Sequence, residues 1–373
     1  MAARFLAPYR AAVIGRTGRG DYGHGLDVAF LDQPKLTLVA VADENEAGRA
    51  AAAKRLKVEK AYADYREMLD RERPQFVAIG PRWVDCHKEM VLACAERGIH
   101  VFCEKPLAPD LASADAMVDA CDRAHVKCAI AFQTRFSPRF ERVKELIASG
   151  AIGEVLELRG RGKEDRRGGG EDLLVLGPHI VDVFRGILGD ASWCFARVTE
   201  KGKPITRASV RPGNEGLGPL AGDRIDAMYG FRDTPAVAHF ATARPAAGAS
   251  TRFGALIFGS KGVIGMGTGW LPPTFLLDSP DWTGAARSKG WVAITSAGLG
   301  KPEPIKSTGM GEANRLMVAD LIHAVETDSQ PRASIHDGRA ALEMLLACHA
   351  SNIAGASVEL PLKERRRHPL EGI

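Results

Sequence analysis

AAVIGRTGRGDYG, residues 11–23, places a short apolar run directly before a glycine-rich loop. A run of this length is typical of a buried strand, and glycines permit the tight turn that follows it. In dinucleotide-binding proteins such a loop lets the backbone approach a pyrophosphate. When Gly15 takes the first glycine position of the usual spacing and Gly20 the last, Thr17 replaces the middle glycine, next to Gly18. We expect these four residues to bind a dinucleotide; the alternative is a glycine turn with a structural role alone.

Short apolar runs continue to alternate with longer amphipathic segments up to about residue 131. Strands are expected at 11–15, 36–43, 76–80, 100–106 and 127–132. Helices are expected between them, at 46–56, 65–71, 84–97 and 111–125. This alternation predicts βαβ units in a doubly wound parallel sheet, with the ligand at the carboxyl ends of the strands.

The pattern changes after residue 132. Helices are expected at 137–149, 177–188, 314–327 and 337–354, and the long stretch in the middle is strand-like and rich in glycine and proline. Antiparallel strands joined by turns fit that stretch. A chain of 373 residues is also long for a single core. We therefore predict an α/β protein with two domains, a Rossmann domain at 1–131 and an α+β domain at 132–373.

The composition argues against several classes of protein. Fifty Lys and Arg residues against 46 Asp and Glu give a net charge of +4, too small to favour nucleic acid binding, and the basic run 363–368 is expected to be solvated. Because no apolar run approaches 18 residues and Pro8 interrupts the N-terminal segment, neither a membrane span nor a signal peptide is expected. Seven cysteines without a C-x-x-C pair favour reduced thiols in the cytoplasm, and no metal site is expected.

Asp43 ends the second predicted strand, 28 residues after Gly15. A carboxylate at that strand end can accept hydrogen bonds from the adenosine ribose hydroxyls and would repel a 2′-phosphate. No Lys or Arg follows before Arg49, so NAD is favoured over NADP. Asp43 could instead, or in addition, cap the helix that begins near Glu46.

The strand 100–106 runs into HVFCEKPLA, residues 100–108. With E-K-P at this point the chain resembles the glucose-fructose oxidoreductase, inositol dehydrogenase and MocA family (Gfo/Idh/MocA). Further matches are FQTRF at 132–136, IGEV at 152–155, GSKGVI at 259–264 and VELP at 358–361. The resemblance covers nearly the whole chain. It implies an N-terminal Rossmann domain and a C-terminal domain with a large, mostly antiparallel sheet.

Lys105 is the catalytic lysine that the resemblance implies, near both the nicotinamide and a substrate hydroxyl. An ammonium there can stabilise a developing alkoxide or relay its proton. The resemblance also implies that Glu104 orients this lysine at the cofactor. The remaining cofactor contacts that it implies are Gly80, Pro81, Gln133 and Arg135. For Arg135 an ion pair between the domains is the alternative.

EDLLVLGPHIVD, residues 171–182, contains the histidine that the family places opposite the lysine. His179 fits the pattern Asp-x-Gly-x-His, which makes it the proton acceptor for a secondary alcohol. Val175 stands where the family has its aspartate. Either Glu171 or Asp172 could replace that carboxylate, and we take Asp172 as the catalytic candidate, with helix or turn capping as its alternative. A buried core histidine is the alternative for His179.

The resemblance implies an NAD(P)-dependent oxidoreductase acting on a secondary alcohol or ketone of a sugar, polyol or derivative. Two other activities stay open: glycoside cleavage through transient oxidation and elimination, and ligand sensing without catalysis. The expected partners are a carbohydrate-like substrate and further copies of the chain, in a dimer or tetramer.

Overall fold

The computed structural model describes residues 8–31, 33–244, 252–281 and 290–373. The chain divides into two compact units. Unit 1 comprises Met1–Pro109, Ser113–Ala131 and Met310–Arg339. Unit 2 comprises Asp110–Ala112, Phe132–Gly309 and Ala340–Ile373. The segment 310–339 thus groups with unit 1, whereas the division predicted from the sequence placed it in the C-terminal domain.

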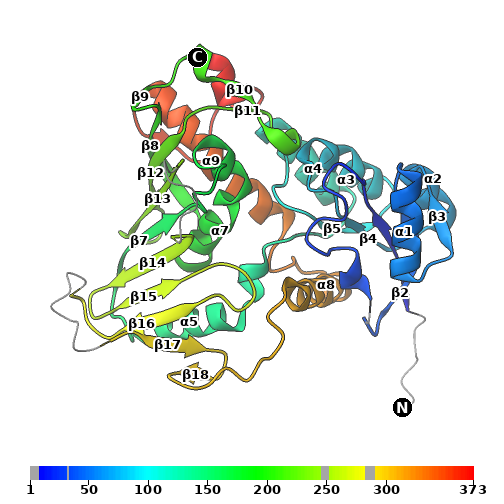
Figure 1. The fold of residues 1–373 in the computed structure, drawn as a ribbon, viewed down its shortest axis with the longest axis horizontal. Helices are drawn as coiled ribbons and strands as arrows, with labels where there is room; N and C mark the ends of the chain where they lie inside the picture. The colour runs from blue at the N-terminus through cyan, green and yellow to red at the C-terminus, as the bar shows by residue number, and fades with distance from the viewer. Residues whose placement is uncertain (1–7, 32, 245–251, 282–289) are drawn as a thin grey trace. The chain divides into compact units, whose positions relative to one another are not determined.

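Unit 1 is built on a parallel sheet with strand order β3-β2-β1-β4-β5-β6, which confirms the doubly wound class. Figure 1 labels β2, β3, β4 and β5 of this sheet. Its strands are β1 Tyr9–Ile14, β2 Leu36–Ala42, β3 Lys60–Tyr62, β4 Phe76–Ile79, β5 His100–Cys103 and β6 Cys128–Ile130. Its main helices are α1 Glu46–Leu56, α2 Tyr65–Glu72, α3 His87–Ala95, α4 Leu111–Arg123 and α8 Met310–Glu326. The sequence did not indicate β3, because that strand is short and exposed and lacks an apolar run.

The connection between β1 and β2 consists of turns followed by a short 3-10 helix, η1, at Val28–Phe30. Its backbone takes positive φ angles at Gly18, Gly20, Gly23 and Gly25, of 85°, 84°, 65° and 81°. A right-handed helix cannot form through such residues. The loop after β1 therefore lacks the long helix whose N-terminus commonly faces a pyrophosphate.

Helix α8 completes unit 1, although it lies about 180 residues after β6 in the chain. It contacts η1, β5 and β6. The Asn314 side chain, fully buried, donates to the His24 carbonyl oxygen at 3.0 Å. Gln33 donates to the Arg315 carbonyl oxygen at 2.9 Å. These contacts explain why 310–339 groups with the parallel sheet.

Unit 2 contains a large sheet with strand order β18-β17-β16-β15-β14-β7-β13-β12-β8-β19 in the described residues. Neighbouring strands are antiparallel except β7 and β13. The longer strands are β7 Val155–Arg161, β8 Ala191–Glu200, β12 Arg224–Phe231, β13 Val237–Ala243 and β14 Gly254–Gly259. The shorter ones are β15 Val263–Met266, β16 Thr274–Leu277, β17 Val292–Thr295, β18 Gly298–Leu299 and β19 Val358–Glu359; β9 Lys203–Pro204 pairs with β8, and β10 Arg211–Pro212 pairs with β11 Pro219–Leu220.

One face of this sheet carries helices. The helices of unit 2 are α5 Pro138–Ala148, α6 Gly170–Val175, α7 Gly177–Leu188 and α9 Ile335–Ala354, which starts in the last residues of unit 1. Helix α7 contacts β7, β13 and β14. Gly160 in β7 allows this approach, because a Cβ there would lie 2.3 Å from Ile180 and 2.6 Å from Phe184. The mostly antiparallel second domain is confirmed.

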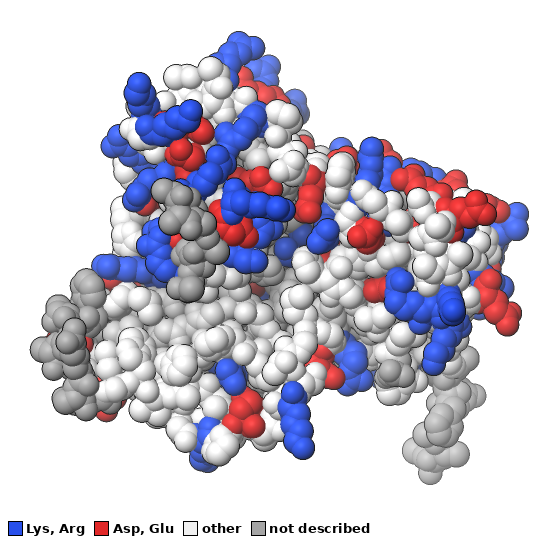
Figure 2. All heavy atoms as spheres, viewed as in Figure 1, with Lys and Arg blue, Asp and Glu red and all other residues white. Residues whose placement is uncertain are grey.

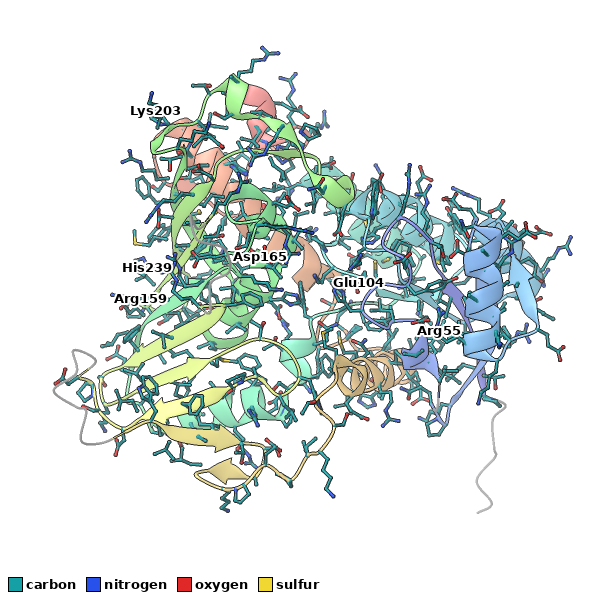
Figure 3. All side chains as sticks on the ribbon, in the orientation of Figure 1. Arg55, Glu104, Arg159, Asp165, Lys203 and His239 are labelled. Atoms are coloured by element: carbon teal, nitrogen blue, oxygen red, sulfur yellow. The ribbon has the colours of Figure 1, made fainter. Side chains whose placement is uncertain are left out.

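The opposite face carries a row of cross-strand partners, which point the same way because paired residues share a face. Phe195, Leu256 and Phe275 belong to this row and are 45%, 39% and 40% exposed. Arg159 and His239 lie between them on β7 and β13 (Figure 3). In Figure 2 the surface over β14 to β17 is largely free of charged side chains. None of the helices in the described ranges is long and apolar enough to span a bilayer.

Candidate functional site

The glycine loop after β1 packs against the loop that follows β4. A Cβ on Gly20 would lie 2.3 Å from the Arg82 nitrogen, and one on Gly23 would lie 2.4 Å from the Gly80 oxygen. The glycines therefore bring two backbone segments together at the carboxyl end of the parallel sheet. The predicted cofactor residues Gly15, Thr17, Gly18 and Gly20 lie in the first of these loops and Gly80 and Pro81 in the second.

Gly15 and Thr17 are held by contacts that the sequence did not indicate. The Tyr22 ring lies against Gly15, where a Cβ would come within 2.2 Å of it. The Thr17 side chain points toward Gly48 of α1, and its hydroxyl donates to Asp43 at 2.6 Å. The Thr17 hydroxyl is therefore engaged within the fold.

Asp43 is buried, at 1% exposed, and its carboxylate accepts hydrogen bonds from four donors. These are the Thr17 hydroxyl, the Thr17 N–H at 3.1 Å, the Tyr22 hydroxyl at 3.0 Å and the Asn45 N–H at 3.0 Å. Asn45, rather than Asp43, is the N-cap of α1, and its side chain accepts from the Gly48 N–H. Asp43 thus shapes the loop, and the neighbouring Glu44 is the exposed carboxylate at this strand end.

A cavity of about 360 Å³ lies at the ends of β1 and β2 within unit 1. Its lining includes the acidic residues Asp43, Glu44, Asp64 and Glu89 and the basic residues Arg16 and Arg66. The hydroxyl of Tyr65, which also lines it, is buried without a hydrogen-bond partner among the described residues. A neutral ribose and adenine fit this lining, because the cavity offers acceptors for hydroxyl groups together with an unused phenol.

The glycine loop carries two arginines, Arg16 and Arg19. Arg16 donates to Glu44 at 2.7 Å. The Arg19 guanidinium lies over the Trp83 ring, 5.0 Å from its centroid. Trp83 therefore packs on a loop arginine in this structure. A helix N-terminus would also attract a pyrophosphate, but the described residues between this loop and β2 form only the short helix η1. In this loop the positive charge that can attract a pyrophosphate is therefore carried by Arg16 and Arg19.

Lys105 follows β5 directly and is only 5% exposed. The peptide bond between Lys105 and Pro106 is cis. The Lys105 N–H donates to Oε2 of Glu104 at 2.9 Å, and Glu104 is completely buried (labelled in Figure 3). The E-K-P turn is therefore a buried, hydrogen-bonded element at the carboxyl edge of the sheet.

His24 is a site residue that the sequence interpretation missed. Its N–H and its Nδ1 both contact Oε1 of Glu104, at 2.8 and 2.7 Å. Burial would raise the pKa of Glu104, but the hydrogen bond and charge of His24, with the Lys105 ammonium, outweigh it and lower the pKa to about 2. The only sequence signal was a histidine shortly after the glycine loop, without local periodicity to explain it.

His87 ties the E-K-P turn to the loop after β4. Its Nε2 lies 2.7 Å from the Pro81 oxygen, and its Nδ1 lies 3.0 Å from the Pro106 oxygen. His87 is fully buried and connects the backbone of the E-K-P turn to the backbone of the loop after β4.

Asp172 lies in α6 of unit 2 and is completely buried. Its carboxylate accepts from the Lys163 N–H at 3.2 Å, the Glu164 N–H at 3.1 Å and the Thr242 hydroxyl. Burial raises its pKa, partly offset by these hydrogen bonds. The geometry is that of an anchor for the segment that follows β7. Glu171, the other acid considered, accepts from the Asn214 side chain at 3.2 Å.

His179 lies in the first turn of α7, which spans the residues predicted for it. Its ring makes an edge contact with Phe253, with the centroids 6.5 Å apart. One turn later Asp182, 1% exposed, accepts from Nε of Arg135 at 2.8 Å. Arg135 therefore forms an ion pair within unit 2, whereas the alternative considered above was a pair between the domains. Gln133, also in unit 2, is 2% exposed.

The predicted site residues fall into two groups, one in each unit. Those of the glycine loop, the loop after β4 and the E-K-P turn belong to unit 1, whereas Gln133, Arg135, Asp172 and His179 belong to unit 2. The parallel sheet, its glycine loop and the E-K-P turn together define a Rossmann-type domain of the kind that binds NAD.

Comparison with known proteins identifies a family for the N-terminal part of the chain. Residues 9–132 match the GFO_IDH_MocA family, described as an oxidoreductase family with an NAD-binding Rossmann fold. This match covers the N-terminal third of the chain and agrees with the resemblance that the motifs indicated.

Two curated relatives show the extent of the likeness. Myo-inositol 2-dehydrogenase of Thermotoga maritima is 32% identical over 186 residues, which cover 48% of this chain and 55% of that enzyme, little more than half of it. Levoglucosan dehydrogenase of Pseudarthrobacter phenanthrenivorans is 27% identical over 368 residues, which cover 87% of this chain and 92% of that enzyme. A solved structure of levoglucosan dehydrogenase with NADH superposes with a TM-score of 0.76 at 24% identity, covering 95% of this chain and all of that one, and supports the fold.

Proposed function

We propose that this protein is an NAD-dependent oxidoreductase that moves a hydride between the nicotinamide and a secondary alcohol or ketone of a sugar, polyol or derivative. The observation that carries the proposal is the buried Lys105, held by its backbone to Glu104 at the carboxyl edge of an NAD-binding domain. Ligands of doubly wound sheets bind at that edge. Relatives named as inositol and levoglucosan dehydrogenases support the choice of a carbohydrate-like substrate.

In this proposal the chain supplies an electrostatic group and a base. The Lys105 ammonium holds the alcohol oxygen and stabilises the charge that develops on it. His179 takes the hydroxyl proton, which suits an imidazole near neutral pH. Bound NAD supplies the hydride acceptor. Asp172 positions the segment between β7 and α6 rather than exchanging a proton, because its carboxylate is used by Lys163, Glu164 and Thr242.

The acidic lining of the cavity in unit 1 supports NAD rather than NADP as the cofactor. A 2′-phosphate would add negative charge near Asp43, Glu44 and Asp64. Arg16, the basic residue beside Glu44, is already paired with it. The remaining cofactor contacts in the proposal are the glycine loop, Gly80, Pro81, Gln133 and Arg135.

The test is to incubate the purified protein with NAD⁺ and a panel of inositols, aldoses and anhydrosugars and to record NADH at 340 nm. Net NADH formation with at least one substrate is expected. Lys105→Met should lower turnover about 10²- to 10⁴-fold while NADH binding persists, and Lys54→Met, at an exposed position of α1, serves as the matched control. Aglycone release without NADH would instead identify transient oxidation, and tight NADH binding without turnover on any compound would identify a sensor.

We also propose that the protein is a homo-oligomer of the cytoplasm. The exposed apolar side chains Phe195, Leu256 and Phe275 on one face of the large sheet support a second copy as the partner of that face. All seven cysteines are buried free thiols, which supports a reducing compartment.

A further inference from the structure

A short chain of hydrogen bonds links the glycine loop to the catalytic lysine candidate within unit 1. His24 binds one oxygen of Glu104 through its N–H and Nδ1, at 2.8 and 2.7 Å. The other oxygen of Glu104 accepts the Lys105 N–H at 2.9 Å. His24 is itself held from behind, because Asn314 of α8 donates to its carbonyl oxygen at 3.0 Å.

The burial of these groups makes His24 important for Glu104. The Glu104 side chain has no exposed surface, whereas the His24 side chain is 31% exposed. A buried carboxylate is costly unless hydrogen bonds and nearby positive charge compensate it. His24 provides the side-chain hydrogen bond on Glu104, which keeps the carboxylate ionised and its orientation defined. Without the imidazole, the carboxylate would protonate or turn, and the acceptor of the Lys105 N–H would change.

We propose that His24 is a positioning residue for Lys105, acting through Glu104, and that its Nδ1–H is the group that matters. This inference rests on the proposed function, in which Lys105 holds the alcohol oxygen. The His24 N–H is present whatever the side chain, so substitutions at this position test the imidazole alone.

The proposal distinguishes three substitutions. His24→Asn places an amide N–H close to the position of Nδ1, His24→Gln places one close to Nε2, and His24→Ala provides neither. The asparagine variant should therefore keep the hydrogen bond to Glu104, and the other two should lose it. A purely structural role for the ring would affect asparagine and alanine variants alike.

The first measurement does not depend on activity. Protein labelled with ¹⁵N-lysine gives an amide resonance for Lys105. The resonance is assigned by its absence from the spectrum of Lys105→Met, and its chemical shift reports the hydrogen bond from the Lys105 N–H to Glu104. The resonance should move upfield in His24→Ala and His24→Gln and stay near its wild-type position in His24→Asn. An unchanged resonance in His24→Ala would overturn the proposal, and so would equal displacement in all three variants.

The second measurement uses turnover at saturating NAD⁺. We expect kcat to fall about 10- to 100-fold in His24→Ala and His24→Gln but less than about threefold in His24→Asn. The KM for NAD⁺ should stay nearly constant in all three variants, because His24 is not among the residues that line the cavity at β1 and β2. Wild-type kcat in His24→Ala, or equal losses in all three variants, would contradict the proposal. If the wild type turns over no substrate while the amide shifts follow the predicted pattern, the proposed function fails and the positioning role of His24 stands.

Discussion

Asp43 shows how packing assigns a carboxylate its role. Thr17, Tyr22 and Asn45 occupy its oxygens, so its hydrogen-bonding capacity is largely used before a ligand enters. Glu44, whose side chain is 59% exposed and paired with Arg16, is the exposed acid at the same strand end. We infer that Glu44 discriminates between ribose and its 2′-phosphate.

Glu44→Gln should weaken the preference for NAD, because it removes a negative charge and releases Arg16. The ratio of the dissociation constants of NADPH and NADH should fall about fivefold, as is usual for one partly exposed charge. Fluorescence titration with both reduced cofactors measures the ratio. Glu46→Gln, exposed and outside the cavity lining, should leave the ratio unchanged. Equal ratios in wild type and Glu44→Gln would assign the preference to other residues.

His179→Asn tests the base. If the imidazole accepts the hydroxyl proton, turnover should fall about 10²- to 10⁴-fold while NADH still binds. Stopped-flow or steady-state rates at pH 7, together with NADH fluorescence, measure both quantities. His323→Asn, at an exposed position of α8, is the control. Wild-type turnover in His179→Asn would remove this residue from the mechanism.

His349 of α9 makes stability depend on pH. Its ring is fully buried, neither nitrogen has a hydrogen-bond partner in the described part of the chain, and the His368 ring lies 6.3 Å away. Burial, helped by His368, lowers the pKa of His349 to about 3 from 6.5. Below pH 6.5 the unfolded chain therefore binds a proton that the folded protein does not, so stability falls as the pH drops toward 3.

His349→Leu should reduce this loss, since leucine has similar volume and does not titrate. Between pH 7 and 5 the free energy of unfolding should decrease by about 2 kcal/mol more in the wild type than in the variant. Urea unfolding at the two pH values measures the difference. Parallel decreases in both proteins would show that His349 is not the group responsible.

The candidate residues differ in how far the sequence could identify them. Lys105 and His179 lie in motifs, E-K-P and G-P-H, that are legible without a structure. His24 was not identified, because its partner Glu104 lies 80 residues away and no local pattern joins them. Asp172 was expected in catalysis, but its engagement with Thr242, 70 residues later, became visible only in the folded chain.

Helices α1 and α7 begin and end at the residues predicted from the sequence, Glu46–Leu56 and Gly177–Leu188. Both have clear local boundaries: Asn45 caps the first, and Gly189 follows the second with a φ of 82°. Helix α6 was missed, because six residues are too few to show a helical period.

The contact between β7 and α7 depends on Gly160, because glycine has no side chain there to separate the strand from the helix. Gly160→Ala should lower the free energy of unfolding by about 1 to 3 kcal/mol, because the added methyl group would overlap Ile180 and Phe184. Chemical denaturation measures the change. Gly311→Ala, in α8 with open space around its Cβ position, is the control and should be neutral or stabilising by up to about 1 kcal/mol. Equal stability of Gly160→Ala and wild type would show that α7 can shift.

At the scale of the whole molecule, the exposed face of the large sheet determines the expected assembly. Phe275 lies in a row with Leu256 across β14 to β16, and the two side chains are 40% and 39% exposed. Such a face favours a second copy of the same chain.

Phe275→Asp should therefore shift the protein toward the monomer without loss of secondary structure, because a charge would be buried between copies. Light scattering after size exclusion measures the mass, and circular dichroism checks the fold. Leu316→Asp, which places the same charge at a 41% exposed position of α8, should leave the mass unchanged. A wild-type monomer, or an unchanged oligomer in Phe275→Asp, would contradict this interpretation of the face.

The sequence by itself determined the alternation of most strands and helices in the first third of the chain, the doubly wound class and the family resemblance, because periodicity, caps and the E-K-P turn are local signals. Only the tertiary structure decided that 310–339 belongs with the parallel sheet, that Asp43 and Asp172 are held within the fold and that His24 binds Glu104. The physical reason is the same in each case. Hydrogen bonds and packing join residues that are far apart in the chain, and such pairings are set by the complete fold.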